Sequence, residues 1–220
     1  MNIIFKRGVC GKIMKLQVAI DRVSLTKAIQ LSKQLDGLVD IVELGTSIVK
    51  DYGLEALKDR RFRLKQSELL VDLKTIDEGE YEFKKGFETS ADILTVMGNA
   101  SRGTLEQTYK IAQERHKGIF IDLMEVDDQR INQISDFHEA IFGLHHARDS
   151  KNDFNAITQI KHFHAKFPNI KHLAVAGGIN LEQARSITQQ GIVEEIIVGN
   201  QITTSDNPIK MAEQFISVMR

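Results

Sequence analysis

Eight short apolar segments recur along the 220-residue chain, and stretches with helical spacing separate them. Each segment is a continuous apolar run instead of an alternation, which is typical of parallel strands covered on both faces. The eight runs are residues 16–21, 39–44, 69–74, 92–97, 118–123, 141–146, 172–176 and 195–199. Helical periodicity is clearest over residues 24–35, 104–116 and 181–191, and the last of these ends at Gly191, a predicted glycine cap.

This strand–helix order, repeated eight times, predicts a single (β/α)8 barrel, the TIM-barrel architecture of the α/β class. A doubly wound open sheet is the main alternative, but eight evenly spaced units in a chain slightly shorter than the roughly 250 residues of a typical barrel favour closure. No linker or low-complexity tract interrupts the chain, so we expect one domain over residues 14–220. Residues 1–13 precede an internal methionine, Met14, and are interpreted either as an appended leader or upstream start, or as a segment capping the bottom of the barrel.

Composition excludes several classes of function. A formal net charge of −1 provides no basic surface for nucleic acid. The single cysteine, Cys10, has no partner for an internal disulfide, which indicates a reducing compartment. The sequence contains no signal-peptide pattern and no run of about 20 apolar residues that would span a bilayer. We therefore expect a cytoplasmic protein that acts on a small molecule, without a nucleic-acid or membrane partner.

Charged side chains stand at the predicted carboxyl ends of the strands, where barrels carry their active sites. A single acid there is usually a helix cap or a solvated loop residue. Several charged ends that converge on one mouth would be costly to bury without a function, so the set as a whole predicts an active site. Its members are Asp21, Glu43, Asp72 with Lys74, Asp122, and His145 with Arg148.

Two of these acids suit a metal ion. Glu43 and Asp72 lie on neighbouring predicted strands, and hard carboxylate oxygens are the ligands of a Mg²⁺ ion that keeps several waters. Lys74, two residues beyond Asp72, points to the same side of the strand and is expected to form an ion pair with it. Asp77 lies past the strand end, where it either caps the next helix or reaches elsewhere.

Glycine-rich turns follow the last two strands, at Gly177-Gly178 and at Gly199-Asn200. In barrels this position frequently holds a phosphate, because bare backbone N–H groups reach the mouth there. Of the two adjacent histidines that end the sixth apolar run, only one faces the barrel axis, and we expect it to be His145. From the residues alone, the sequence predicts a metal-assisted enzyme acting on a small phosphorylated substrate.

From about Met14 to the C-terminus, the strand ends resemble those of the 3-hexulose-6-phosphate synthase family, in the orotidine-monophosphate-decarboxylase group of barrels. The similarity is carried by LQVAID, VELGTSIV, VDLKTIDEGEYE, ADILTVMG, IDLMEVDD, HLAVAGGI and IIVGNQIT. Its most specific part is the Asp-x-Lys-x-x-Asp pattern at Asp72, Lys74 and Asp77, the hallmark of the whole group. In that group the second aspartate reaches into the site of a partner subunit, so the resemblance implies an obligate homodimer with shared active sites.

The resemblance also implies roles for the other residues. Glu43 and Asp72 match acids that bind Mg²⁺, Asp21 and Lys74 match polar groups around the substrate, and His145 is the candidate proton carrier. The glycines at Gly177, Gly178 and Gly199 match turns that bind the phosphate. The implied reaction joins formaldehyde to ribulose 5-phosphate through a 1,2-enediolate, giving a 3-hexulose 6-phosphate.

A related family, the 3-keto-L-gulonate-6-phosphate decarboxylases, reaches the same enediolate by releasing carbon dioxide. Ala176 and Asp122 resemble the synthases, whereas Arg148 in HHARD resembles the decarboxylases, and Asn200 follows neither pattern closely. The synthase reaction is our first prediction and the decarboxylase reaction the alternative. A barrel that binds a sugar phosphate without turning it over is a third, lesser hypothesis.

Overall fold

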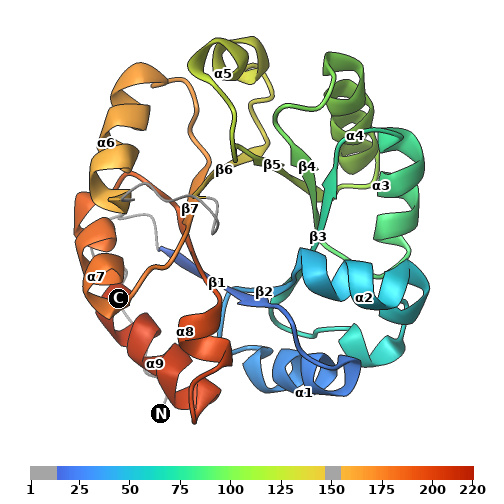
Figure 1. Cartoon of the computed structure of the whole chain (residues 1–220), viewed down its shortest axis with the longest axis vertical. Helices are drawn as coiled ribbons and strands as arrows, with labels where there is room; N and C mark the ends of the chain where they lie inside the picture. The colour runs from blue at the N-terminus through green and yellow to red at the C-terminus, as the bar shows by residue number, and fades with distance from the viewer. Residues whose placement is uncertain (1–13, 147–154) are drawn as a thin grey trace, which may run out of the picture.

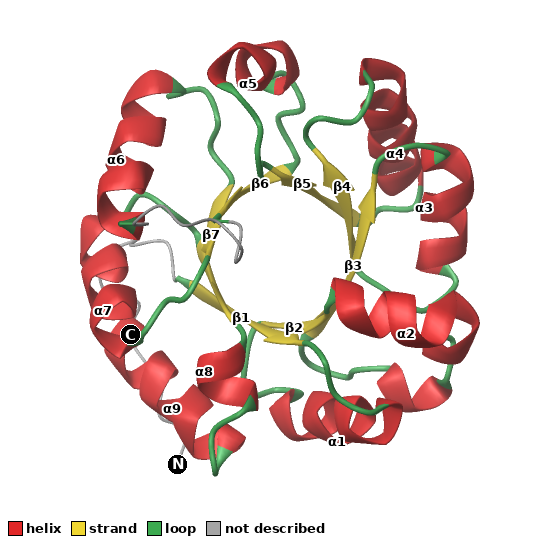
Figure 2. Ribbon diagram, in the orientation of Figure 1, coloured by secondary structure: helices red, strands yellow, loops and turns green. Residues whose placement is uncertain are grey.

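The structure, a computed structural model, describes residues 14–146 and 155–220. Its parallel strands form a closed barrel in sequence order, and helices surround it (Figures 1 and 2). The strands are β1 (Lys15–Ile20), β2 (Ile41–Leu44), β3 (Glu68–Thr75), β4 (Ile93–Met97), β5 (Gly118–Asp122), β6 (Ile141–His145), β7 (Leu173–Ala176) and β8 (Glu195–Val198). The helices are α1 (Leu25–Leu35), α2 (Thr46–Leu57), η1 (Arg60–Phe62), α3 (Gly79–Phe87), α4 (Arg102–Glu114), α5 (Asp128–Ile134), α6 (Ala156–Lys166), α7 (Leu181–Gln190), α8 (Asn200–Thr203) and α9 (Pro208–Met219).

Closure of the barrel depends on the pairing between its first and last strands. β1 runs parallel to β8, with Lys15 opposite Glu195 and Val18 opposite Val198. The predicted (β/α)8 barrel is therefore confirmed, and the open-sheet alternative is wrong because an open sheet would leave its two edge strands unpaired. The alternative interpretations of residues 1–13 concern a segment outside the described residues.

Local signals in the sequence account for several element boundaries. The Ser24 side chain accepts a hydrogen bond from the Lys27 backbone N–H and caps α1. Asn180 and Gln183 form a reciprocal capping box at the start of α7. That helix ends at Gly191, whose left-handed φ of 66° is the conformation that a glycine cap allows, as predicted.

Apolar side chains fill the barrel below its mouth. They form a cluster distinct from the larger core, which lies between the sheet and the helices. The interior layer consists of Ile41, Leu70, Ile93, Phe120 and Ala174. Because side chains alternate along a strand, the residues two positions further on point to the same interior and lie nearer the mouth. Those positions on β2, β3 and β5 carry Glu43, Asp72 and Asp122. The strand periodicity thus places the acids on an apolar floor.

A buried acid lies at the opposite end of the barrel, which the sequence reading did not single out. Glu195 is 2% exposed and its Oε1 has no hydrogen-bond partner among the described residues. Burial raises the pKa of its carboxyl group to about 8; Lys15 opposes this shift, and Glu68 and Asp40 add to it. The folded chain therefore holds a proton on Glu195 that the unfolded chain releases near pH 4.5.

We expect Glu195→Gln to stabilise the protein at pH 8 and to leave it unchanged near pH 4.5. Between these two values the folded state binds one more proton than the unfolded state, so the free energy of unfolding of the wild type falls as the pH rises. A neutral amide removes this dependence and should add about 1 to 3 kcal/mol at pH 8, or roughly 3 to 8 °C in Tm. Thermal unfolding from pH 4.5 to 8.5 measures the difference, with the exposed Glu182→Gln as control. Equal pH dependence of variant and wild type would contradict the assignment.

No helix among residues 14–146 and 155–220 combines the length and the apolar character needed to cross a membrane.

Candidate active site

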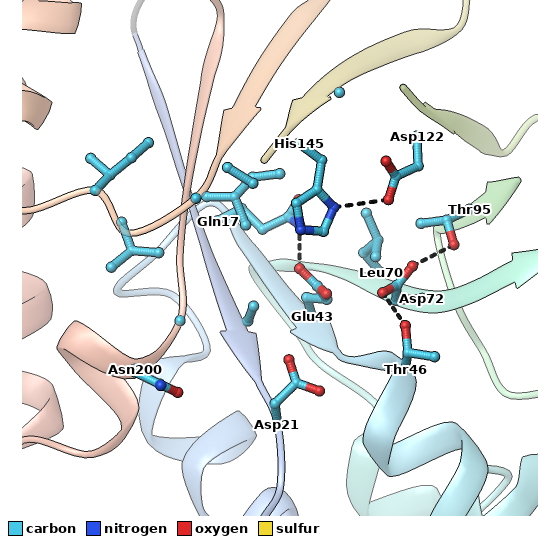
Figure 3. Close-up of a pocket in the computed structure, with 18 of the residues that line it drawn as sticks. Gln17, Asp21, Glu43, Thr46, Leu70, Asp72, Thr95, Asp122, His145 and Asn200 are labelled. Carbon is cyan, nitrogen blue, oxygen red and sulfur yellow. Dashed lines mark hydrogen bonds and ion pairs between the residues drawn. The ribbon is translucent and has the colours of Figure 1, made fainter. Parts of the chain in front are cut away.

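A cavity of about 590 Å³ opens at the carboxyl ends of the strands. Most of the residues predicted for the site line it, namely Asp21, Glu43, Asp72, Lys74, Asp122, His145, Gly177, Gly178, Gly199 and Asn200. Figure 3 shows the carboxylates of β2, β3 and β5 and the ring of His145 converging on this space. Two predicted residues are not among the lining residues. Asp77 is exposed in the loop after β3, and Arg148 lies outside the described residues.

Two threonine hydroxyls hold the Asp72 carboxylate in place. Thr46 Oγ1, at the start of α2, donates to Oδ2 at 2.5 Å, and Thr95 Oγ1, on β4, donates to Oδ1 at 2.6 Å. Both carboxylate oxygens therefore accept a hydrogen bond from a side chain that is itself anchored on the barrel, as Figure 3 shows. Such bonds fix the orientation of the carboxylate toward the cavity.

Lys74 reaches its position through an irregular backbone. The register of β3 against β4 shifts between Val71 and Thr75, and Lys74 has a left-handed φ of 48°. Its backbone N–H donates to Thr95 Oγ1 at 2.9 Å. Non-glycine residues adopt this conformation only when surrounding contacts require it, and such sites are often functional. Here the turn of the backbone directs the ammonium group into the cavity.

The Lys74 ammonium contacts two acids. The predicted ion pair with Asp72 is present at 3.4 Å, and a closer one joins Nζ to Asp122 Oδ2 at 2.5 Å. Burial lowers the pKa of Lys74, but Asp72 and Asp122 outweigh it, so the pKa lies above its ordinary value. The lysine therefore stays protonated and serves as a fixed positive charge beside the acids.

Asp122 also positions His145. Its Oδ2 lies 2.9 Å from His145 Nδ1, and its Oδ1 accepts the Met124 backbone N–H at 2.8 Å. Burial alone would raise the pKa of Asp122, but the hydrogen bond to His145 and the charge of Lys74 lower it to about 2. Because Asp122 is ionised, Nδ1 is the nitrogen that carries a proton in this bond. In the neutral ring, Nε2 is then the nitrogen that can accept a proton.

Glu43 is a deeply buried acid beside the expected metal position. It is 7% exposed, and Gln17 Nε2 donates to its Oε2 at 2.6 Å. Burial, together with the negative charges of Asp72 and Asp21, raises the pKa of Glu43 well above its ordinary value. A divalent cation between Glu43 and Asp72 would relieve this repulsion, so the donor set suits Mg²⁺.

Glu43 and Asp72 are the two carboxylates expected to bind such an ion directly. Within the described ranges, no three His, Cys, Asp or Glu side chains are close enough to hold a metal by themselves. Mg²⁺ commonly binds through one or two carboxylates, with waters and substrate oxygens in its other positions. Glu43 and Asp72 fit this kind of site.

Asp21 is held at the edge of the cavity by a close backbone approach. Its Oδ1 accepts hydrogen bonds from Ser47 Oγ at 2.7 Å and from the Ser47 backbone N–H at 3.3 Å. A Cβ atom at Gly45 would lie 2.4 Å from the Asp21 carboxylate atoms. Glycine at this position is therefore what lets the carboxylate at the end of β1 sit against the loop after β2.

The turns predicted to bind phosphate lie together on the other side of the mouth. Gly177 and Gly178 have positive φ angles of 122° and 64°, which glycine adopts without steric cost. Asn200 follows Gly199, and its Oδ1 accepts a hydrogen bond from Arg22 Nη2 at 3.2 Å. Arg22, which follows Asp21, also lines the cavity.

Four residues of the site were missed by reading the sequence. Gln17 and Thr95 are polar residues inside apolar strand runs, and that interruption is a signal that could have identified them. Thr46 begins α2 and Arg22 follows β1, and a polar residue at such a position is ordinary and carries no such signal. Their roles follow only from the contacts that they make.

The helix-cap interpretation of Asp77 is wrong. The N-cap of α3 is Glu78, and no side chain makes a capping hydrogen bond there. Asp77 is exposed beside two large exposed apolar side chains, Ile76 at 53% and Tyr81 at 62%. Within one chain it does not reach the cavity, which leaves the shared-site prediction as the remaining interpretation.

The chain is a closed (β/α)8 barrel with a cluster of acids, a lysine and a histidine at its mouth. This is the architecture of TIM-barrel enzymes, whose active sites lie at the carboxyl ends of the strands. The chain belongs to the orotidine 5'-phosphate decarboxylase / HUMPS family, whose profile matches residues 14–215. The family resemblance seen in the strand-end motifs is thereby confirmed.

Among its relatives, 3-hexulose-6-phosphate synthase from Bacillus subtilis (strain 168) is 34% identical over 207 residues, covering 91% of this chain and 96% of that protein. The crystal structure of 3-hexulose-6-phosphate synthase from Salmonella typhimurium is 27% identical, with a TM-score of 0.85 over 94% of this chain and 98% of that one. The crystal structure of KGPDC from Streptococcus mutans shares the fold with a TM-score of 0.81 and 21% identity over 94% and 97% of the two chains.

Proposed function

We propose that this protein catalyses the Mg²⁺-dependent aldol condensation of formaldehyde with D-ribulose 5-phosphate, giving D-arabino-3-hexulose 6-phosphate. The observation that carries this proposal is the connected cluster of Asp72, Lys74, Asp122 and His145 at the barrel mouth. It is supported by relatives named 3-hexulose-6-phosphate synthase, of which the first described matches this chain over nearly its whole length.

In the proposed reaction His145 moves the proton. Asp122 fixes its Nδ1–H, so Nε2 is the atom that takes a proton from C1 of ribulose 5-phosphate. The electron pair left at C1, delocalised as a 1,2-enediolate, forms the new carbon–carbon bond to formaldehyde. The formaldehyde oxygen then takes up a proton, so that no atom is lost from the two reactants.

In the proposed reaction, Lys74 stabilises negative charge on the sugar oxygens. Lys74 stays protonated between Asp72 and Asp122 and places a positive charge at the mouth. Glu43 and Asp72 would hold the Mg²⁺ ion, which when bound supplies further positive charge for the enediolate. The turns at Gly177, Gly178, Gly199 and Asn200 face the same cavity and are the proposed site for the phosphate.

Decarboxylation of 3-keto-L-gulonate 6-phosphate is the second candidate reaction. It is favoured by Arg148 in the HHARD stretch, a position outside the described residues, and it would use the same enediolate and the same cluster. Ala176, which lines the cavity, supports the synthase reaction instead.

A paired assay separates the two reactions. With Mg²⁺ present, we expect the purified protein to consume formaldehyde with ribulose 5-phosphate much faster than it releases carbon dioxide from 3-keto-L-gulonate 6-phosphate. Faster release of carbon dioxide would contradict the synthase proposal. A binder without activity would be stabilised thermally by ribulose 5-phosphate yet would not exchange the C1 proton with deuterated water.

We further propose that the protein acts as a homodimer whose subunits share active sites. The segment around Asp77 supports this, because Ile76 and Tyr81 expose large apolar side chains. A groove of about 450 Å³ between α2 and α3 adjoins Tyr81 and is lined partly by Val49, Leu54 and Leu73. Exposed apolar surface of this kind marks association sites, and a second copy of the chain would bring its own Asp77 across the same face.

A further inference from the structure

Arg22 lines the cavity and, among the described residues, forms no ion pair with the acids of the cluster. Lys74 and His145 both contact Asp122. Within the described ranges, the Arg22 guanidinium makes no ion pair with a carboxylate, and its side-chain hydrogen bond goes to the neutral amide of Asn200 at 3.2 Å. A guanidinium has five N–H donors, so most of them are available to a ligand.

The backbone directs Arg22 away from the acids. Its φ of 51° is left-handed, and its backbone N–H donates to Ser47 Oγ at 2.7 Å. The same Ser47 hydroxyl donates to Asp21 Oδ1 at 2.7 Å. One serine therefore anchors two consecutive residues, with the Asp21 carboxylate held at the first turn of α2 and the Arg22 side chain extending to Asn200 at the start of α8. Figure 3 shows Asp21 and Asn200 on separate sides of this part of the cavity.

A formal positive charge beside the glycine turns would complement the negative charge of a phosphate group. Gly177, Gly178 and Gly199 contribute backbone dipoles to the cavity wall but no formal charge. A phosphate monoester carries between one and two negative charges near neutral pH, and a planar guanidinium binds its oxygens with two parallel hydrogen bonds. Closure of the barrel brings Arg22 to Asn200 although 178 positions separate them in the chain.

We infer that Arg22 binds the phosphate group of the substrate, and that Asn200 is a positioning residue that holds the guanidinium over the glycine turns. The inference rests on the proposed function for the identity of the sugar phosphate. It assigns the anionic end of the substrate to the β1, β7 and β8 side of the mouth and leaves the β2, β3 and β5 side to the reacting carbons.

The test measures Kd by titration calorimetry for ribulose 5-phosphate and for inorganic phosphate, using the full chain. We expect Arg22→Ala to raise both Kd values about 10- to 100-fold, and Arg22→Lys to restore part of the affinity for each. The exposed Arg63→Ala, in the segment before β3 at the other end of the barrel, should leave both values unchanged. Thermal unfolding verifies that the variants remain folded.

A double-mutant cycle tests the positioning role of Asn200. Asn200→Ala removes the acceptor of the Arg22 hydrogen bond, so we expect it to raise both Kd values in the wild-type background and to add little in the Arg22→Ala background. Equal effects in the two backgrounds would overturn the positioning role.

Kd values for Arg22→Ala within twofold of wild type would overturn the inference, as would weaker binding of ribulose 5-phosphate with unchanged binding of inorganic phosphate. Absence of binding of either compound by the wild type would overturn it too. If phosphate affinity depends on Arg22 but formaldehyde is not consumed, the inference stands and the proposed reaction fails.

Discussion

Asp72→Asn is expected to reduce Mg²⁺-dependent activity about 1,000-fold or more while the barrel stays folded. The substitution removes one of two proposed metal-binding carboxylates and part of the electrostatic environment of Lys74, which keeps its contact with Asp122. A metal ion supplies several kcal/mol of charge stabilisation in a transition state, and each 1.36 kcal/mol is a factor of about ten in rate. The amide is close in size to the carboxylate and can still accept from Thr46 or Thr95, so folding should be preserved.

The measurement combines turnover of formaldehyde with Mg²⁺ affinity by calorimetry and with the thermal midpoint. Asp206→Asn, an exposed aspartate that does not line the cavity, is the matched control and should behave as wild type. An Asp72→Asn protein with full activity would refute the metal site. Loss of activity with the Mg²⁺ affinity of the wild type would indicate that Asp72 acts through Lys74 and not by binding the metal.

A mixture of Lys74→Ala and Asp77→Ala chains that form random dimers is expected to recover about a quarter of wild-type activity, although each variant alone is inactive. In a two-fold symmetric dimer with shared sites, one site of the mixed dimer pairs an intact Lys74 with an intact Asp77 from the partner. About half of the randomly formed dimers are mixed, and each has one working site of two, which leads to the fraction of about one quarter. The exposed position of Asp77, outside the cavity of its own chain, is the structural reason for expecting this.

Co-expression with two affinity tags isolates the mixed dimers, which have one working site of two and should therefore show about half of the wild-type activity per dimer. Dimers in which both chains carry Lys74→Ala, under the same two tags, serve as control and should stay inactive. If the doubly tagged Lys74→Ala/Asp77→Ala dimers are inactive, then Asp77 does not act across subunits.

Most of the fold could be predicted from the sequence. Continuous apolar runs located all the strands of the barrel to within a few residues, because strands covered on both faces have no polar face to interrupt the pattern. From their places at the predicted strand ends, Glu43, Asp72 and Asp122 were expected to converge on one mouth, and the cavity contains them. The metal, the dimer and the catalytic roles of these residues remain predictions.

Other parts of the site could not be predicted, since they depend on contacts between residues far apart in the chain. The second partner of Lys74 is Asp122, 48 positions away, and it is reached because β3 is irregular at Lys74. The threonines that hold Asp72 belong to neighbouring segments of the barrel wall. Which polar residue meets which acid is set by strand register and by local backbone turns, and neither appears in the hydrophobic pattern.

The sequence by itself determined the number and order of the strands and which residues stand at their ends, because both follow from local periodicity. Only the tertiary structure determined the protonation states of the side chains and the partners with which they interact. Barrel closure places Arg22 beside Asn200, and burial keeps Glu195 protonated at neutral pH. The physical reason is that ionisation and long-range hydrogen bonds depend on distance and solvent exposure in three dimensions, which spacing along the chain does not specify.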